Sequence, residues 1–318
     1  MKMNRPQIEK ELQKNDSTLL SFPNRGYWGD KAWRGNCSGW IQAFLIWKYQ
    51  VEKMAELFAG SGTGSDVARD MGIDYIGADL NPNPVRKNIL SLDAIKDEVP
   101  EEFLGADMLF MHPPYGAEIK IPYAGSMYKD PTGELSKSDL GQMQWDKFMK
   151  TLNAVIMKYY ASMETGSRMS ILMGDVRRNG RCYSMLKDIV QPGQLDQIII
   201  KAQHNCVSDG RTYAHKNFVP IVHEYIMVIK KLAPYIIDFS LPTHHEMDIR
   251  DSKTATWRDV VMAVMDKLQE ATLDDIYAEI EGHEKCKTNE HWKEKVRQTL
   301  QMSSHCQNKA RGVWAVAA

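Results

Sequence analysis

The sequence predicts an α/β protein whose mostly parallel sheet is covered by helices on both faces, with a smaller module after it. Short apolar runs alternate with stretches of helical periodicity, a glycine-rich turn follows one of these runs, and the composition changes after residue 242. The chain has 318 residues and is 43% hydrophobic, enough to bury an α/β core and a second unit. We expect one domain over residues 1–242 and another over 243–318.

The apolar runs predict strands, and the longer amphipathic stretches between them predict helices. In the longest of these stretches, Trp145, Phe148, Leu152 and Ile156 recur at helical spacing. Strands that alternate with helices pair in parallel, and a ligand binds at their carboxyl ends. The expected strands are 53–58, 75–78, 107–111, 169–173, 197–201 and 221–229, and the expected helices are 38–49, 65–71 and 141–163.

The first expected strand runs into a turn that contains Gly60, Gly62 and Gly64. These glycines let the backbone approach a ligand closely, and the helix that follows points its N-terminus at that ligand. Asp79 ends the next strand nineteen positions after Gly60, close to the spacing at which an acidic residue binds ribose hydroxyls. Nicotinamide-binding folds use a similar turn. Their strict pattern is G-x-G-x-x-G, and this chain does not match it because position 65 is Ser.

Residues 112–115 read His-Pro-Pro-Tyr and follow the apolar run 107–111. The two prolines lack N–H groups and stiffen the chain, so its outward carbonyls can only accept hydrogen bonds. Acceptors favour the pyramidal geometry that an aromatic amine needs for attack, and Tyr115 can hold a base face on. The alternative interpretation of Pro-Pro-Tyr is a strand exit with an incidental tyrosine.

Together these segments resemble the amino-group DNA methyltransferases, which make N6-methyladenine or N4-methylcytosine with S-adenosylmethionine. Residues 58–62 are similar to the donor-binding motif of that family, and residues 112–115 to its [Asp/Asn/Ser]-Pro-Pro-[Tyr/Phe] catalytic motif. The resemblance spans about residues 22–231. It implies a Rossmann-like S-adenosylmethionine-dependent methyltransferase fold.

The resemblance also implies roles for individual residues. His112 and the Pro113 carbonyl would hold the amine, and Tyr115 would stack on the flipped base. Asp79 would bind the ribose of the donor, and Asp93 its adenine ring. The catalytic residues it implies are His112, Pro113, Pro114 and Tyr115, and the cofactor-binding residues are Asn36, Ser38, Phe58, Ala59, Gly60, Gly62, Asp79 and Asp93.

His112 departs from the family pattern, because Asp, Asn or Ser usually occupies that position. A neutral imidazole has one acceptor nitrogen, whereas its protonated form has none. We therefore expect activity to fall as the pH drops through the histidine pKa, more steeply than in a His112→Asn enzyme. Adenine is the expected target base. The alternative interpretation of His112 is that it marks a degenerate, inactive site.

The net charge of −1 requires a nucleic-acid-binding protein to concentrate its positive charge locally. From Lys285 to the C-terminus there are seven Lys or Arg against two Glu. The long polar loops 116–140 and 204–219 are expected to close over a flipped nucleotide and contact DNA, with Arg211 and Lys216 in the second loop. An insertion with no role is the alternative for either loop.

Three amphipathic helices and a hairpin are expected in the C-terminal module. The helices start near Trp257, Thr272 and Thr288, and the hairpin covers residues 306–316. This order resembles a winged helix-turn-helix, in which the third helix enters a major groove and the wing contacts phosphates. A protein-interaction or dimerisation unit is the alternative. The candidate DNA-binding residues here are Lys293, Lys295, Arg297, Lys309 and Arg311.

Cysteine and histidine usage gives no metal-ligand pattern, and no metal is expected because a sulfonium donor already activates its methyl group. The five cysteines include no C-x-x-C pair, which indicates reduced thiols and, without a signal peptide or an apolar run of membrane length, a cytoplasmic protein.

We expect a site-specific DNA methyltransferase that acts on the adenine N6 amine of double-stranded DNA by base flipping. The alternatives are cytosine N4 as the target, an RNA or protein-amide methyltransferase, and a non-catalytic regulator that senses the donor. A homodimer is compatible with the sequence but not required by it. No membrane partner is expected. The sequence does not indicate whether a cognate restriction nuclease exists.

Overall fold

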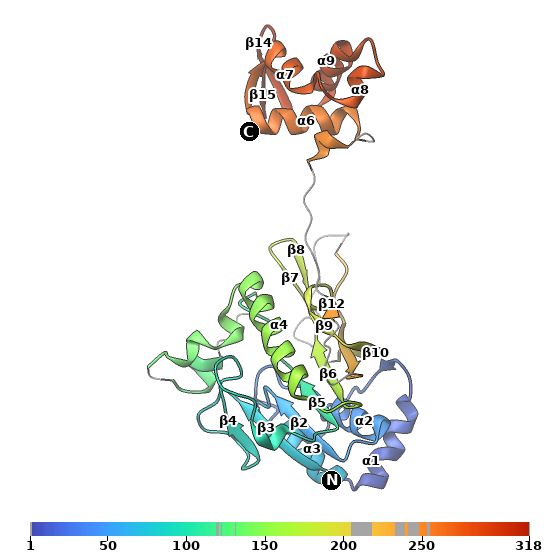
Figure 1. Ribbon diagram of the computed structural model, residues 1–318, viewed down its shortest axis with the longest axis vertical. Helices are drawn as coiled ribbons and strands as arrows, with labels where there is room; N and C mark the ends of the chain where they lie inside the picture. Colours follow the sequence, from blue (N-terminus) through green and yellow to red (C-terminus); the bar gives the residue numbers. More distant parts are fainter. Residues whose placement is uncertain are drawn as a thin grey trace. The chain divides into compact units, whose positions relative to one another are not determined.

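The computed structural model describes residues 2–118, 121, 123–130, 132–204, 218–232, 239–240, 248–252 and 255–317. The chain divides into two compact units, Met1–Pro242 and Thr243–Ala318 (Figure 1). Each unit has its own buried apolar core.

The N-terminal unit is built on an eight-stranded sheet with the order β1-β10-β11-β6-β5-β2-β3-β4. All neighbouring strands pair in parallel except β10 with β11 and β11 with β6. The expected α/β fold with a mostly parallel sheet is therefore confirmed. The strands are β1 (Leu19–Leu20), β2 (Lys53–Leu57), β3 (Asp74–Asp79), β4 (Ile89–Ser91), β5 (Met108–Met111), β6 (Arg168–Met173), β10 (Gln194–Ala202) and β11 (His223–Lys230).

Helices cover both faces of this sheet (Figure 1). Helices α1 (Arg5–Leu12), α2 (Gly39–Tyr49) and α3 (Thr63–Met71) lie on one face, and α4 (Trp145–Ser162) lies on the other. Because successive strand residues point to opposite faces, Met54 of β2 packs with the α1–α3 layer whereas Ala55 packs with the α4 layer.

Several elements were not among those expected. α1, β1 and β4 carry too few apolar residues in a periodic pattern to be recognised from sequence. The smaller elements of this unit are α5 (Met185–Asp188), β7 (Asp175–Arg178), β8 (Arg181–Ser184), β9 (Gln191–Pro192), β12 (Phe239–Ser240), η1 (Gln13–Asn15), η2 (Glu101–Phe103), η3 (Tyr123–Met127), η4 (Leu135–Lys137) and η5 (Leu140–Gln142).

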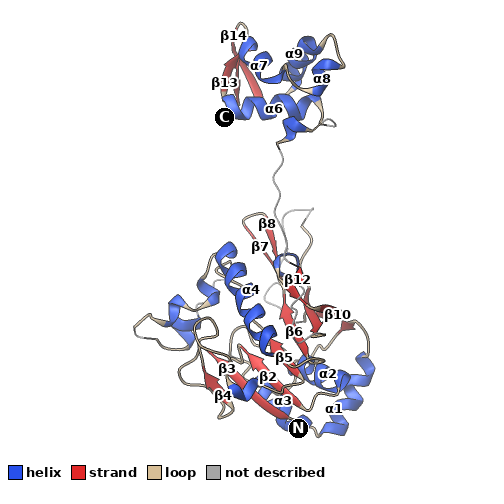
Figure 2. Cartoon of the chain, viewed as in Figure 1, coloured by secondary structure: helices blue, strands red, loops and turns tan. Residues whose placement is uncertain are grey.

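The C-terminal unit packs helices against a small antiparallel sheet of order β13-β15-β14 (Figure 2). Capping boxes at Thr256 and Thr272 start its first two long helices. The third helix begins at Trp292 and not near Thr288, because residues 288–291 form a turn between α8 and this helix. The elements are η6 (Ile249–Asp251), α6 (Trp257–Leu268), β13 (Glu270–Thr272), α7 (Leu273–Ile280), α8 (Glu284–Lys287), α9 (Trp292–Met302), β14 (Cys306–Ala310) and β15 (Val313–Val316). The winged-helix identification stays a prediction.

Candidate active site

The strand order reverses at the centre of the sheet, and this reversal positions the candidate site. From β2 the chain proceeds outward to β3 and β4, then returns to β5 on the other side of β2. The connections therefore leave the carboxyl ends of β2 and β5 in opposite directions, which opens a crevice there. The glycine turn follows β2, and His112 follows β5 directly.

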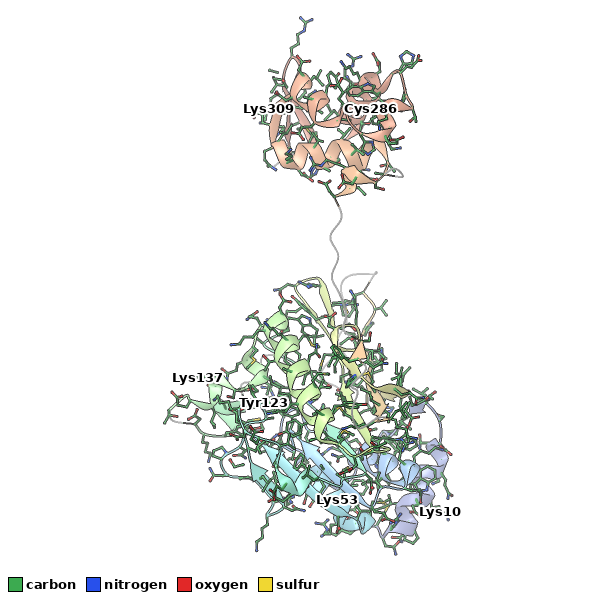
Figure 3. The ribbon with its side chains drawn as sticks, viewed as in Figure 1. Lys10, Lys53, Tyr123, Lys137, Cys286 and Lys309 are labelled. Carbon is green, nitrogen blue, oxygen red and sulfur yellow. The ribbon has the colours of Figure 1, made fainter. Side chains whose placement is uncertain are left out.

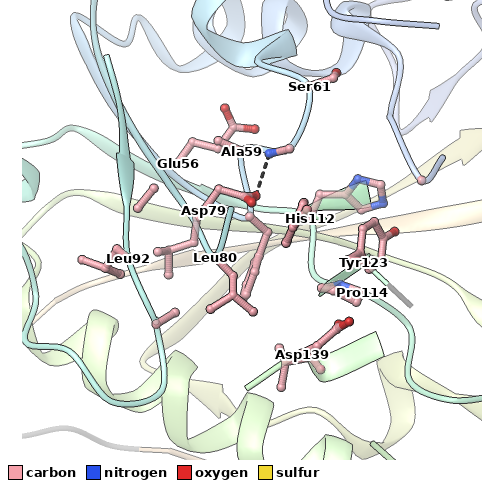
Figure 4. A pocket seen from close by; sticks show the side chains of 18 of the residues that line it. Glu56, Ala59, Ser61, Asp79, Leu80, Leu92, His112, Pro114, Tyr123 and Asp139 are labelled. Carbon is pink, nitrogen blue, oxygen red and sulfur yellow. Dashed lines mark hydrogen bonds between the residues drawn. The ribbon is translucent and has the colours of Figure 1, made fainter. Parts of the chain in front are cut away.

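A cavity occupies this crevice, and we call it the glycine-loop cavity (Figure 4). It encloses roughly 840 Å³, open solvent at its mouth included. Side chains or backbone from the ends of β2, β3 and β5 line it. Its lining includes Trp33, Asn36, Glu56, Phe58, Ala59, Gly60, Asp79, Asp93, His112, Pro114, Tyr123 and Tyr128.

The glycine turn adopts left-handed backbone conformations at three positions. Phe58 has a φ of 63°, Gly60 of 48° and Gly62 of 77°. A Cβ atom at Gly62 would lie 2.7 Å from Cγ of Arg86, so this position excludes a side chain on two grounds. Gly62 precedes α3 and directs the chain into the helix, but it does not line the cavity.

Asp79 ends β3 and holds the glycine turn in place. Its Oδ2 accepts a hydrogen bond of 2.8 Å from the Gly60 N–H, drawn as a dashed line in Figure 4, and its Oδ1 accepts one of 2.9 Å from the Asn81 N–H. Burial raises the pKa of this carboxyl, while the two backbone donors and the Tyr128 hydroxyl oppose the change. Asp79 thus lies beside the turn, and its predicted binding to ribose stays a prediction.

Glu56 is a buried carboxyl of this cavity that the sequence interpretation missed. Gln42 Nε2 donates to its Oε1 at 2.6 Å, and the Tyr75 hydroxyl donates to its Oε2. Burial raises its pKa to about 8, against the two hydrogen bonds, and the nearby Asp79 charge raises it further. Glu56 is therefore mostly protonated at neutral pH.

Three aromatic side chains gather over the glycine turn. The ring centroids of Trp33 and Tyr128 are 5.9 Å apart, and those of Tyr123 and Tyr128 are 6.2 Å apart. The sequence interpretation assigned the loop 116–140 to the target nucleotide. In the structure Tyr128 lies at the glycine-loop cavity, where it is bonded to Asp79. Tyr123 lines this cavity and its neighbour, and Gly116 and Ile121 of the same loop line the neighbour, so the assignment to the target nucleotide stays a prediction.

The second cavity lies on the other side of His112, and we call it the Tyr115 cavity. Four polar residues contribute to its lining: Lys201, Gln203, His204 and Glu224. Pro113 and Tyr115 line this cavity and not the first one. The residues common to both cavities are Gly35, Asn36, Cys37, His112, Pro114 and Tyr123. The two cavities thus share one wall.

A chain of polar contacts links His112 to β10 and β11. His112 Nε2 lies 3.2 Å from the Tyr115 hydroxyl, which donates to Glu224 Oε1 at 2.8 Å. Lys201 pairs with Glu224 Oε2. Burial lowers the pKa of His112 to about 4, although the Glu224 charge opposes this, so the imidazole is neutral near pH 7. Burial is the largest influence on the pKa of Glu224 and works to raise it, but the charge of Lys201, the His112 ring and the hydrogen bonds from Lys201 and Tyr115 together lower it, so the net direction is downward.

Three other predicted donor-site residues lie in different places. Asn36 lines both cavities, and its Oδ1 accepts from the Thr63 hydroxyl at 2.5 Å. Asp93 lines the glycine-loop cavity and pairs with Lys96 at 3.1 Å. Ser38 lines neither cavity, because its hydroxyl donates to the Arg25 carbonyl under the start of α2.

The predicted DNA-binding residues of the C-terminal unit are all exposed. On α9, Arg297 pairs with Glu294 at 2.8 Å and Lys295 donates to Gln298 at 2.8 Å, while Lys293 lies over the rings of Tyr277 and Trp292. Lys309 lies on β14 (Figure 3), and Arg311 lies in the turn between β14 and β15. The predicted residues Arg211 and Lys216 fall outside the described part of the chain.

The described residues contain neither a metal-binding cluster nor a membrane-spanning helix. Nowhere in that part of the chain do three His, Cys, Asp or Glu side chains gather as a metal site would require. None of the helices described there is long and apolar enough to cross a membrane.

No protein-family model matches the chain, and neither does any curated protein. Among solved structures it is similar to TrmN from Thermus thermophilus, with 18% identity and a TM-score of 0.33 over 63% of this chain and 50% of that one. An RNA methyltransferase from Salinibacter ruber in complex with S-adenosyl-L-homocysteine matches at 11% identity and a TM-score of 0.31, over 62% of this chain and 95% of that one. A SAM-dependent methyltransferase from Archaeoglobus fulgidus matches at 12% identity and a TM-score of 0.32, over 60% of this chain and 93% of that one.

The chain spans only half the length of TrmN. With TM-scores this low, the assignment of the fold rests on the strand order and pairing described above.

Proposed function

We propose that the protein transfers a methyl group from S-adenosylmethionine to the exocyclic N6 amine of adenine in double-stranded DNA. One observation carries the proposal: the glycine-loop cavity and the Tyr115 cavity share a wall that contains His112 and Pro114. Two cavities in contact at a cluster of hydrogen-bond acceptors suit a transfer between two bound molecules.

The residues of the glycine-loop cavity fit the donor. Asp79 already accepts from Gly60, Asn81 and Tyr128, and a carboxylate has room for a further ribose hydroxyl. The left-handed turn at Gly60 lets the backbone approach the ligand, and Asp93, which lines the same cavity, would accept from the adenine ring of the donor. The donor, when bound, supplies a methyl group that its sulfonium has already activated.

The residues of the Tyr115 cavity fit a flipped base. Tyr115 offers an aromatic face, and the backbone carbonyls around Pro113 and Pro114 can only accept hydrogen bonds. Neutral His112 adds one acceptor nitrogen. An amine held by acceptors on both N–H groups keeps its lone pair free to face the methyl group, so that the N–C bond can form as the sulfonium S–C bond breaks and S-adenosylhomocysteine leaves. The proton that the amine loses can leave through solvent, so this step requires no metal.

The choice of duplex DNA rests on the C-terminal unit. Its exposed cations lie on α9 and on the β14–β15 hairpin, which supports the predicted winged helix-turn-helix, a module that would direct α9 at a major groove and the hairpin at phosphates. Replacing Lys309 and Arg311 with Gln should weaken DNA binding similarly for all sequences and reduce the slope of log affinity against log salt by about 2. An unchanged slope would argue for a protein-interaction unit.

The direct test is to incubate the protein with labelled S-adenosylmethionine and mixed-sequence duplex DNA, then digest the DNA and identify the labelled nucleoside. N6-methyladenine supports the proposal, whereas N4-methylcytosine keeps the mechanism and changes the base. Label on RNA or protein supplied in parallel would move the substrate class. Donor binding without any transfer would favour a sensor or a degenerate site at His112.

A Tyr115→Ala variant separates these roles. It should abolish transfer and leave the dissociation constant of the donor nearly unchanged, because Tyr115 lines only the second cavity. Equal loss of donor binding and transfer would mean that Tyr115 is structural.

A further inference from the structure

Four polar side chains form a line from the sheet to the shared wall. Lys201 of β10 and Glu224 of β11 are direct partners in the antiparallel register, and they form an ion pair. Glu224 is 7% exposed and accepts from Tyr115, which in turn contacts His112. The line therefore connects a buried charge to the residue that departs from the expected catalytic motif.

The direction of each hydrogen bond follows from the number of protons. The Tyr115 hydroxyl has one proton, and it points to Glu224 Oε1 at 2.8 Å, because a carboxylate can only accept. The same hydroxyl must then accept in its contact of 3.2 Å with His112 Nε2, so the ring carries its proton on Nε2. In a neutral imidazole this leaves Nδ1 as the acceptor.

We propose that Glu224, acting through Tyr115, is a positioning residue that fixes His112 in the Nε2–H tautomer and so presents the Nδ1 lone pair to the target amine. The inference rests on the proposed methyl transfer. Within the described residues, the only hydrogen bond of the His112 ring uses Nε2, and the ring lies on the wall common to both cavities.

This arrangement explains how histidine can replace Asp or Asn at the first motif position. A carboxylate oxygen accepts whatever its surroundings, whereas an imidazole nitrogen accepts only in one of two tautomers. With the proton on Nδ1, the ring would present an N–H to the N–H groups of the amine. We call the line of contacts from Lys201 through Glu224 and Tyr115 to His112 the relay. It excludes that tautomer because Tyr115 has no second proton to donate to Nε2.

The chain contains a matched arrangement away from both cavities. His223 Nε2 lies 2.8 Å from the Tyr225 hydroxyl, which contacts Asp175 Oδ2 at 3.5 Å, and neither His223 nor Tyr225 lines a cavity of the site. Tyr225→Phe is therefore the control for Tyr115→Phe: each change removes one hydroxyl from a tyrosine bonded to a histidine and a carboxylate.

The kinetic test compares Tyr115→Phe and Glu224→Gln with the wild type. Both keep the aromatic face, and both should lower kcat about 10- to 100-fold with little change in the KM for the donor, as expected for loss of a hydrogen bond to a charged group. Tyr225→Phe should keep the wild-type kcat. In a His112→Asn background the same two changes should cost less than about twofold, because Asn has no tautomers to select.

If the losses persist in the His112→Asn background, the network is only structural and the proposal is wrong. Melting temperatures of all variants identify any that fail to fold. Glu224→Gln tests the charge and Tyr115→Phe the hydroxyl, so each checks the other.

A second measurement does not depend on activity. In protein labelled with ¹⁵N-histidine, the His112 signals, identified by their loss in His112→Asn, should show the Nε2–H tautomer. Tyr115→Phe should give a mixture of tautomers, and Tyr225→Phe should not. One outcome is a single tautomer in the wild type, a mixture in Tyr115→Phe, and no methyl transfer to any substrate. That result would overturn the proposed function and support the relay. Turnover with a tautomer that the variants leave unchanged would overturn the relay alone.

Discussion

Replacing Glu56 with Gln should change how the stability of the N-terminal unit depends on pH. Glu56 is 3% exposed, and burial raises its pKa from 4.5 to about 8. Gln resembles the protonated acid in size and charge and can still accept from Gln42. The variant therefore removes one titration and leaves the packing of β2 nearly intact.

The folded-state pKa is raised, so the contribution of Glu56 to stability is fully present below pH 4.5 and is lost as the pH rises toward 8. The loss amounts to about 1.4 kcal/mol per pH unit within that window. Between pH 5.5 and 7.5, the free energy of unfolding of the wild type should thus fall by roughly 2.5 kcal/mol relative to Glu56→Gln.

Urea unfolding at the two pH values, followed by tryptophan fluorescence, measures this difference. Subtracting the variant from the wild type at each pH removes contributions that the two share, including that of the C-terminal unit. Glu52→Gln is the control, because Glu52 precedes the same strand and is exposed. A wild type and Glu56→Gln that lose stability in parallel would refute the burial argument.

Three further predictions concern the same region. Asp79→Asn should weaken donor binding about 10- to 100-fold in calorimetry, because an amide cannot replace the charged acceptor; unchanged affinity would exclude Asp79 from the donor site. Burial lowers the pKa of His112 to about 4, so methyl transfer should persist to about pH 5 and then fall as the imidazole gains a proton, whereas His112→Asn should lack that fall. Identical pH profiles of kcat would contradict the role of the ring. Gly62→Ala should lower the melting temperature more than Gly72→Ala, since φ is positive at both ends of α3 but only the Cβ at Gly62 meets another atom, 2.7 Å away; equal losses would mean that Arg86 moves aside freely.

The central elements could be predicted because local patterns determine them. Signals within single segments include the apolar runs of β2, β5 and β6 and the helical spacing in α4. The glycines of the turn likewise predict its left-handed backbone from the local sequence alone. Asp79 was recognised from its distance in sequence to Gly60, since two adjacent parallel strands bring their carboxyl ends together.

The residues that complete the site could not be predicted, because they depend on pairing between distant segments. Lys201 and Glu224 meet only through the β10–β11 register, and a shift of one residue would turn each to the other face. Glu56 looked like one residue of an apolar strand; its partners Gln42 and Tyr75 come from α2 and β3. Ser38 was predicted to bind the donor, but it does not line a cavity because its hydroxyl donates to the Arg25 carbonyl.

The wall between the two cavities has a consequence for the order of events in turnover. Each cavity has its own lining beyond the six common residues, so donor and acceptor can occupy the protein at the same time. A nucleophile of the protein that carried the methyl group from one cavity to the other would have to lie in that wall. Its candidates include His112, whose free nitrogen accepts from the amine in the proposed mechanism, and the thiol of Cys37, whose pKa is raised by burial to about 12. Such a thiol stays protonated and unreactive. Catalysis should therefore proceed through a ternary complex, with double-reciprocal plots that intersect.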